Sequence, residues 1–415
     1  MKLSIYRTTQ LVGVLATTSN GLAFSYDRNY RGPGCYPISV SMPILEEPYA
    51  QNIAMPFFDG LLPEGEQRRE LSEILHVSST SVMKLLAALA GECVGDLILV
   101  SENMDINEVL EGSGYTQVTS GELETLLRPQ SIERLRFLAA RRLSLAGAQA
   151  KIGLYRNRGE WFATQGLAPT THIIKPSALF DNTVLVNEFF MMRLAKSCGL
   201  TVPETWVIQA GQNYGLVIER FDRVAQNDEI IRVGQEDFCQ ALSISPLAKY
   251  EGDGGPGLAE LFTTVLHNAL PPLANMRSLL RIALFNYLIG NCDAHAKNFS
   301  LLRRHDNGQI SVAPAYDLVC TTFYGERLLR SMAMRIGRHS HIDRIDQEDF
   351  RLFAEESGIN IKVIADELHA LYESIVENID AVMKDVASEI SEYAEVASKL
   401  REHILHELAT RVVTL

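Results

Sequence analysis

Apolar residues recur with two different periods along the 415 residues of this chain. Between residues 141 and 222 they alternate with polar residues in short runs, and such alternation predicts β-strands. One interval within this region has the longer period of a helix instead. The predicted strands cover residues 151–155, 160–164, 171–175, 205–210 and 215–220, and the predicted helix covers residues 185–197.

Helical periods dominate from residue 236 onward. Residues 279–289 are mostly apolar, which predicts a buried helix that ends at Gly290. Residues 359–415 contain neither proline nor glycine and predict amphipathic helices over residues 361–383 and 386–415. A strand-rich part that precedes a helical part predicts an α+β fold with two lobes.

The first 130 residues have a pattern of their own. Residues 4–7 and 11–16 predict a β-hairpin with its turn at residues 8–10. Residues 65–90 carry apolar positions at helical spacing. We therefore expect three regions: an N-terminal α/β subdomain over residues 1–130, a strand-rich small lobe over 131–222, and an all-helical lobe over 223–415.

Composition narrows the classes of function. The formal net charge of -13 argues against extended nucleic-acid binding by this chain alone, because phosphate contacts need clustered lysine and arginine. Six scattered cysteines form no CxxC pair, which argues against a disulfide framework or a zinc site and indicates a reducing, cytoplasmic setting. No segment has the length and apolarity of a membrane span, and the first apolar stretch is too short for a signal peptide.

Three polar residues follow the helix that is predicted to end at Gly290. Asp293 and Asn298 are five residues apart, and Asp317 lies nineteen residues beyond Asn298. Phosphoryl transfer requires a carboxylate that orients the attacking hydroxyl and oxygen ligands that hold Mg²⁺ on the phosphates. Protein kinases place a catalytic Asp, a metal-binding Asn and a second metal-binding Asp in this order. The pattern favours a kinase, and a solvated turn after a core helix is the alternative.

The strand-rich region holds candidates for nucleotide contacts. The small residues between Ser144 and Lys151 would let backbone N–H groups approach phosphate oxygens, although a hairpin turn fits the same run. Lys175 ends a predicted strand, and Glu188 follows on the next helix. Kinases place their phosphate-binding lysine and its acidic partner in this way, whereas two unrelated surface charges would show the same spacing.

Eight motifs in a fixed order give the chain a specific resemblance. They read SLAGAQAK, THIIKPS, NEFF, ERFDR, QEDFCQAL, KYEGDGGPG, DAHAKNFSLL and PAYDL, and the earlier stretch FFDGLLPEGEQRR fits with them. The chain resembles the HipA family, which consists of bacterial serine/threonine kinase toxins of toxin–antitoxin systems linked to persistence. The resemblance covers about residue 3 to at least residue 330.

The resemblance implies a bilobal protein-kinase-like fold that binds ATP between its lobes, with Mg²⁺ on the phosphates. Asp293 corresponds to the catalytic aspartate, and Lys297 lies near it. Asn298 and Asp317 correspond to the Mg²⁺ ligands, and Ser144 to a serine that becomes autophosphorylated. The implied nucleotide-binding residues are Ala146, Gly147, Ala148, Gln149, Lys151, Lys175, Glu188, Glu219, Phe221 and His295.

Some of these roles have open alternatives. Lys297 either touches the γ-phosphate or caps a helix, and His295 fits a structural histidine that hydrogen-bonds the loop backbone. The glycine-rich residues 252–257 fit phosphate binding or a tight turn into a helix over residues 258–266.

The implied function is a toxin kinase that transfers the γ-phosphate of ATP to a Ser or Thr of a host protein. The family implies an aminoacyl-tRNA synthetase as a target and a helix-turn-helix antitoxin as the partner through which DNA is bound. A small-molecule or lipid kinase on the same scaffold and a non-catalytic, antitoxin-binding co-repressor are the alternatives. The sequence identifies neither the target, nor the antitoxin, nor the oligomeric state.

Overall fold

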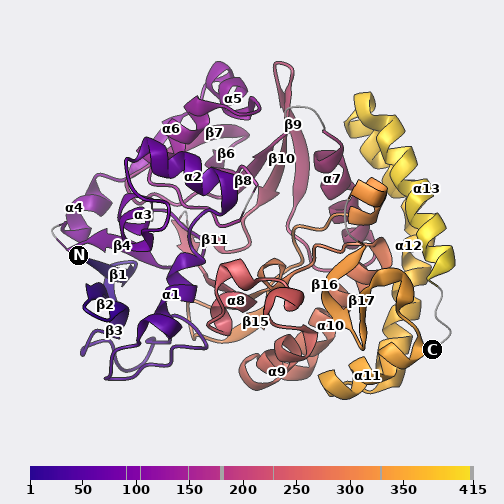
Figure 1. The fold of residues 1–415 in the computed structure, drawn as a ribbon. Coiled ribbons are helices and arrows are strands. Elements are labelled where there is room, and N and C mark those ends of the chain that lie inside the picture. The colour runs from indigo at the N-terminus through magenta and orange to yellow at the C-terminus, as the bar shows by residue number, and fades with distance from the viewer. Residues whose placement is uncertain are drawn as a thin grey trace. The chain divides into compact units, whose positions relative to one another are not determined.

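The computed structural model describes residues 1–89, 91–102, 104–147, 149–177, 182–227, 229–327 and 330–411 (Figure 1). The chain divides into two compact units, and each is described by itself. The first unit consists of Met1–Leu179, Ile208–Pro246 and Leu302–Gln309. The second consists of Phe180–Val207, Leu247–Leu301 and Ile310–Leu415.

The first unit begins with a four-stranded sheet in the order β3-β2-β1-β4. Its first two strands form the predicted hairpin, with Arg7 opposite Gln10 and Leu3 opposite Leu15. Side chains such as Leu3 and Phe24 are fully buried beneath helices that follow the sheet. The elements are β1 (Lys2–Arg7), β2 (Gln10–Thr18), β3 (Gly21–Tyr26), α1 (Gln51–Asp59), α2 (Gly65–Ile74), α3 (Val82–Leu89) and β4 (Ile98–Ser101).

A second sheet of six strands has the order β5-β7-β6-β8-β10-β9. Five of its strands correspond to those predicted between residues 141 and 222. Its last strand, β9, crosses the boundary between the two units. The elements are α4 (Ile106–Glu111), β5 (Gly114–Gln117), α5 (Ser120–Leu127), α6 (Ile132–Ala140), β6 (Ile152–Asn157), β7 (Glu160–Gln165), β8 (His172–Pro176), β9 (Thr205–Ala210) and β10 (Asn213–Glu219).

Short elements complete the first unit after this sheet. Strands β11 and β12 form an antiparallel ribbon in which Arg223 lies opposite Arg232. The brief helix α8 begins with a capping box, in which Asp237 and Gln240 satisfy each other's backbone N–H groups. The elements are β11 (Arg223–Gln226), β12 (Glu229–Arg232), β13 (Gly234–Asp237) and α8 (Phe238–Ala241).

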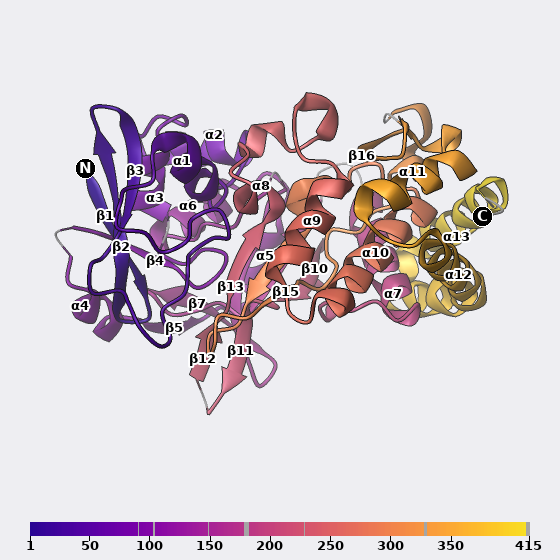
Figure 2. The ribbon, with the colours of Figure 1, turned by 90° about the horizontal axis from the view of Figure 1, so that it is seen from below.

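Helices form most of the second unit (Figure 2). The long helix α12 packs against α7, α10 and α13. Helix α10 is buried around most of its circumference, as expected for a helix in the middle of a packed layer. The elements are α7 (Thr183–Ser197), α9 (Leu258–Asn268), α10 (Pro272–Ile289), β14 (Ser300–Arg303), β15 (Ile310–Val312), β16 (Ser331–Ile336), β17 (His339–His341), α11 (Gln347–Ser357), α12 (Ile361–Glu389) and α13 (Ala394–Thr410).

The structure confirms the α+β class and refines the predicted organisation. The prediction of an all-helical lobe over residues 223–415 is wrong, because this part also contains the strands β11 to β15 and the antiparallel pair β16 and β17. Helix α7, predicted as part of the small lobe, belongs to the second unit. All six cysteines are free thiols in this structure. Within the described ranges, none of the helices is both long enough and apolar enough to cross a membrane.

Candidate active site

The candidate catalytic loop begins where α10 ends. Gly290 has a φ of 73°, and a Cβ at this position would lie 2.3 Å from Oγ1 of Thr322. A glycine is therefore needed to end the helix here. The guanidinium of Arg411 caps the helix by donating from Nη1 to the carbonyls of Tyr287, at 3.1 Å, and Leu288, at 3.2 Å. The loop thus starts from a fixed point.

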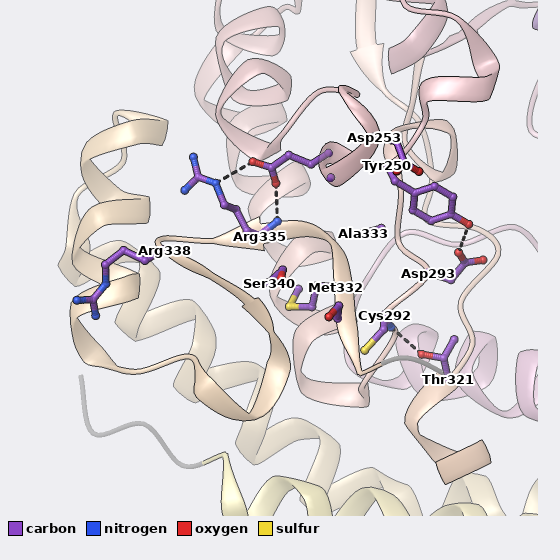
Figure 3. Close-up of a pocket in the computed structure, with 13 residues that line it drawn as sticks. Tyr250, Asp253, Cys292, Asp293, Thr321, Met332, Ala333, Arg335, Arg338 and Ser340 are labelled. Atoms are coloured by element: carbon purple, nitrogen blue, oxygen red, sulfur yellow. Dashed lines mark hydrogen bonds and ion pairs between the residues drawn. The ribbon is translucent and has the colours of Figure 1, made fainter. Parts of the chain in front are cut away.

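Asp293 lies exposed on this loop (Figure 3). The hydroxyl of Tyr250 donates to Oδ1 of Asp293 at 2.8 Å. The backbone carbonyl of Asp293 accepts from the N–H of His295 at 2.8 Å and from Nδ2 of Asn298 at 3.0 Å. The backbone is therefore fixed by its neighbours while the carboxylate reaches solvent, which is the arrangement that a residue orienting a substrate hydroxyl requires.

Asp317 adopts a left-handed backbone conformation, with a φ of 57°. Non-glycine residues at positive φ are uncommon and concentrate at functional sites. The preceding residue ties this segment to the catalytic loop, because the hydroxyl of Tyr316 donates to the carbonyl of Lys297 at 2.7 Å. Asp317 and Asn298 are thus each one residue from the two ends of that hydrogen bond.

The donor chemistry of Asn298 and Asp317 fits Mg²⁺. The ion is commonly held by one or two side-chain oxygens together with phosphate oxygens rather than by a cage of protein ligands. The described part of the chain has no group of three His, Cys, Asp or Glu side chains that could hold a metal ion. A carboxylate and a carboxamide suit an ion that arrives with its nucleotide.

Lys297 and His295 are both buried in the loop, with 8% and 6% of their surface exposed. The imidazole of His295 meets the ring of Tyr250 edge-on, with centroids 5.2 Å apart. This contact supports the structural alternative for His295, since a ring packed in this way orders the loop. The predicted contacts of both residues with nucleotide stay predictions.

A pocket of about 930 Å³ lies beside Asp293. Tyr250 and Asp293 lie at one end of the labelled residues in Figure 3, and Arg338 lies at the other. Between them the wall is mainly apolar or small. The lining residues along this wall include Cys292, Thr321, Met332, Ala333 and Ser340.

The candidate phosphate loop lies in the first unit. Ser144 is fully buried there, with its hydroxyl donating to the carbonyl of Leu61 at 2.7 Å. Gly147 has a φ of 107°, and its carbonyl accepts from the N–H of Glu64 at 3.0 Å. The ammonium of Lys151 donates to the carbonyl of Ala146 at 2.8 Å, so the lysine spans the loop.

This arrangement fits a compact backbone turn, and it constrains two of the predictions. Phosphorylation of Ser144 would require the loop to leave the place that it occupies here, since the hydroxyl is inaccessible. Gln149 is exposed and available to a ligand, whereas Ala148 lies outside the described residues.

The remaining nucleotide candidates fall in both units. Lys175 is buried in β8, with Leu216 of β10 opposite it. Glu219 is exposed at the end of β10, and Phe221 is half-buried two residues further on. Glu188 is buried in α7, which belongs to the second unit. The pairing of Lys175 with Glu188 therefore stays a prediction, as do the adenine contacts of Glu219 and Phe221.

Comparison with known proteins decides the family. Residues 3–100 match the HipA N-terminal domain, and residues 143–390 match the HipA-like C-terminal domain. The chain belongs to the HipA family. It is 34% identical over 394 residues to a putative kinase of Sinorhizobium fredii, covering 93% of this chain and 92% of that protein.

HipA of Shewanella oneidensis is matched both in sequence and in structure. The serine/threonine-protein kinase toxin HipA of Shewanella oneidensis is 28% identical over 405 residues, covering 92% of this chain and 91% of the relative. The solved complex of Shewanella oneidensis HipA, HipB and operator DNA matches with a TM-score of 0.81 and 26% identity, and the match covers 100% of both chains. The protein is thus a kinase of the HipA type, and it uses ATP.

Sequence reasoning assigned no role to two hydroxyls of this HipA-family site. Tyr250 contacts the carboxylate of Asp293, and Tyr316 ties the segment of Asp317 to the loop. Both residues lie within motifs that carry the resemblance, KYEGDGGPG and PAYDL. Their membership of those motifs was the available signal, but spacing alone did not show which atoms they would reach.

Proposed function

We propose that this protein is a toxin that transfers the γ-phosphate of ATP to a serine or threonine of a host protein. The observation that carries the proposal is the Asp293 carboxylate, exposed at the end of a loop whose backbone is hydrogen-bonded on both sides. Asn298 and Asp317 supply oxygen ligands on segments joined by one hydrogen bond. The membership of the HipA family supports the same reaction.

Each residue then has a physical task. Asp293 accepts a hydrogen bond from the acceptor hydroxyl and orients it for in-line attack on the γ-phosphorus. Asn298 and Asp317 would hold Mg²⁺, which neutralises the charge that develops on the phosphate oxygens. Lys175 and the loop from Ala146 to Lys151 would bind the phosphates.

The pocket beside Asp293 supports a polypeptide as the acceptor. Its volume of about 930 Å³ exceeds what one hydroxyl-bearing side chain fills. Its wall at Met332 and Ala333 is apolar and would take the side chain next to the phosphorylated residue. A protein acceptor uses this space because its chain continues on both sides of the serine or threonine.

A helix-turn-helix antitoxin is the proposed partner, and an aminoacyl-tRNA synthetase is the proposed class of target. The relative from Shewanella oneidensis was solved with HipB and operator DNA. The net charge of -13 on the present chain favours a partner that supplies most of the contacts to DNA phosphates.

The test is a comparison of phosphopeptides from cells that express the wild-type chain or the Asp293→Asn variant at equal levels. We expect serine or threonine sites that gain phosphate only with the wild type. Growth inhibition should follow the same division, and co-expression of the antitoxin should relieve it. Identical phosphopeptides in the two cultures would reject the proposed function.

A further inference from the structure

The glycine-rich segment from Lys249 to Gly257 forms a tight turn closed by backbone hydrogen bonds, and phosphate binding does not explain this geometry. The carbonyl of Tyr250 accepts from the N–H of Asp253 at 3.0 Å and from that of Gly255 at 2.9 Å. A Cβ at Gly255 would lie 2.3 Å from the carbonyl of Ala248 and 2.7 Å from that of Tyr250. Glycine is therefore required for the turn to close on the Tyr250 backbone.

The same segment is joined to the catalytic loop next to Asp293. The Tyr250 hydroxyl donates to Oδ1 of Asp293, and the Tyr250 ring packs edge-on against His295. The carbonyl of Lys249 accepts from the N–H of Ala296 at 3.3 Å. Three contacts thus fix the position of Tyr250 against the loop. Two are made by its side chain and one by the backbone of its neighbour Lys249.

The next residue, Glu251, ties the segment to strand β16. Its Oε1 pairs with Nε of Arg335 at 2.8 Å, and its Oε2 accepts from the backbone N–H of Arg335 at 2.7 Å. A Cβ at Gly257 would lie 2.9 Å from Oε1 of Glu251, so glycine leaves the room that the carboxylate needs. We call this two-point contact the Glu251–Arg335 latch; Figure 3 draws both bonds.

We propose that Tyr250 is a positioning residue for Asp293 and that the Glu251–Arg335 latch holds Tyr250 in place. The Tyr250 hydroxyl engages one oxygen of the Asp293 carboxylate and stops its rotation. The acceptor hydroxyl can then bind the other oxygen at a fixed angle. Loss of this restraint lowers the rate of transfer because a misplaced carboxylate leaves the acceptor poorly aligned.

This inference rests on the proposed function, and the two fail differently. The assay is incorporation of label from γ-labelled ATP into a dephosphorylated soluble bacterial extract by the full-length protein. Absence of label with the wild type would count against the proposed function. The inference about Tyr250 is read only from differences between variants when the wild type does incorporate label.

Tyr250→Phe keeps the ring against His295 and removes the hydroxyl. We expect kcat for transfer to fall about tenfold, the size of a lost hydrogen bond to a charged group, while KM for ATP stays within about twofold. Tyr372→Phe in α12 is the matched control and should match the wild type. An unchanged or increased kcat for Tyr250→Phe, or an equal loss for Tyr372→Phe, would overturn the positioning role.

The latch is tested by Glu251→Gln alone and in combination with Tyr250→Phe. If the latch acts through Tyr250, Glu251→Gln lowers kcat about threefold or more by itself and adds little to the loss already caused by Tyr250→Phe. Independent losses that multiply in the double variant would show that Glu251 acts by another route. An inactive but folded single variant with no ATP binding would equally reject the latch, since the inference places it on the acceptor side.

Discussion

Two carboxylates of this protein, Glu92 and Asp293, differ in how their negative charge is accommodated. In the first unit, Glu92 is fully buried and accepts from Arg220, Arg223 and Arg232 at 2.7–3.2 Å. In the second unit, Asp293 is exposed and its side chain accepts a hydrogen bond from Tyr250. A buried carboxylate must have its charge compensated inside the protein, whereas an exposed one can leave an oxygen for a substrate.

The comparison shows that the residue types of a charged motif do not by themselves tell whether the motif serves folding or catalysis. The ERFDR motif contains the predicted adenine contacts Glu219 and Phe221, yet its Arg220, Asp222 and Arg223 are buried in ion pairs. Burial alone would raise the pKa of Glu92, but the surrounding guanidinium groups hold it well below its usual range. The Glu92 cluster therefore serves structure, whereas the exposed Asp293 is the residue for which a catalytic role is predicted.

The largest expected effect is a loss of phosphate transfer, without a loss of stability, when Asp293 is replaced. Asp293→Asn should lower phosphate transfer by about a hundredfold or more, since the variant loses the charged acceptor for the substrate hydroxyl. Its affinity for Mg-ATP should stay within a few fold, and its midpoint in urea should not change. Transfer at the wild-type rate would exclude Asp293 as the catalytic aspartate.

The second effect is on stability. Glu92→Gln removes the carboxylate that the buried Arg220 and Arg223 share with the half-buried Arg232, and it should lower the free energy of unfolding by about 3–5 kcal/mol. Glu46→Gln is the control, because the ion pair of Glu46 with Arg31 is exposed and its loss should leave the free energy of unfolding nearly unchanged. Urea unfolding followed by circular dichroism measures both. Equal losses in the free energy of unfolding would mean that burial does not determine how much these ion pairs contribute to stability.

A smaller effect is expected at Asp317. In Asp317→Asn, the asparagine tolerates the left-handed backbone conformation of this position. The substitution removes one negative charge from the proposed Mg²⁺ ligands. We expect affinity for Mg-ATP to fall about tenfold and affinity for ATP in EDTA to stay the same. Isothermal titration with and without Mg²⁺ distinguishes the two. A matching loss in EDTA would assign Asp317 to the fold and not to the ion.

The smallest effect concerns pH. Burial, together with the charge of Arg156, lowers the pKa of His172 to about 4. The unfolded chain therefore binds this proton first as the pH falls below about 6.5, so stability is present above that pH and is lost progressively toward pH 4. Because His172 is partly exposed, the loss should be on the order of 1 kcal/mol. His172→Asn should flatten this part of the curve in urea unfolding from pH 7.5 to 4.5, and an unchanged slope would contradict the assignment.

The five strands of the second sheet and the helix ending at Gly290 could be predicted from the sequence, because their apolar runs have the length of a strand or of a helix. Strand β16 was missed because it lies in a part of the chain where helical patterns dominate, although Met332, Ala333 and Met334 are buried in succession like residues of β10. The expected boundary between residues 130 and 131 has no counterpart between the two compact units.

The candidate site shows the same limit at the level of single atoms. Asp293, Asn298 and Asp317 could be proposed as site residues because their order and spacing resemble those of protein kinases. The hydroxyls of Tyr250 and Tyr316 could not, since their partners lie 43 and 19 residues away. Such contacts depend on how loops meet in space. The structural role of Arg220 and Arg223 could not be predicted for the same reason, because their partner Glu92 lies far from them in the sequence.

The cap that Arg411 places on α10 links the last described turn of the chain to the start of the catalytic loop. Cleavage of the chain before Arg411 would therefore uncap the helix that leads to Asp293 without removing any of the proposed substrate-binding residues. A residue far along the chain from the loop thus keeps the start of the loop in position.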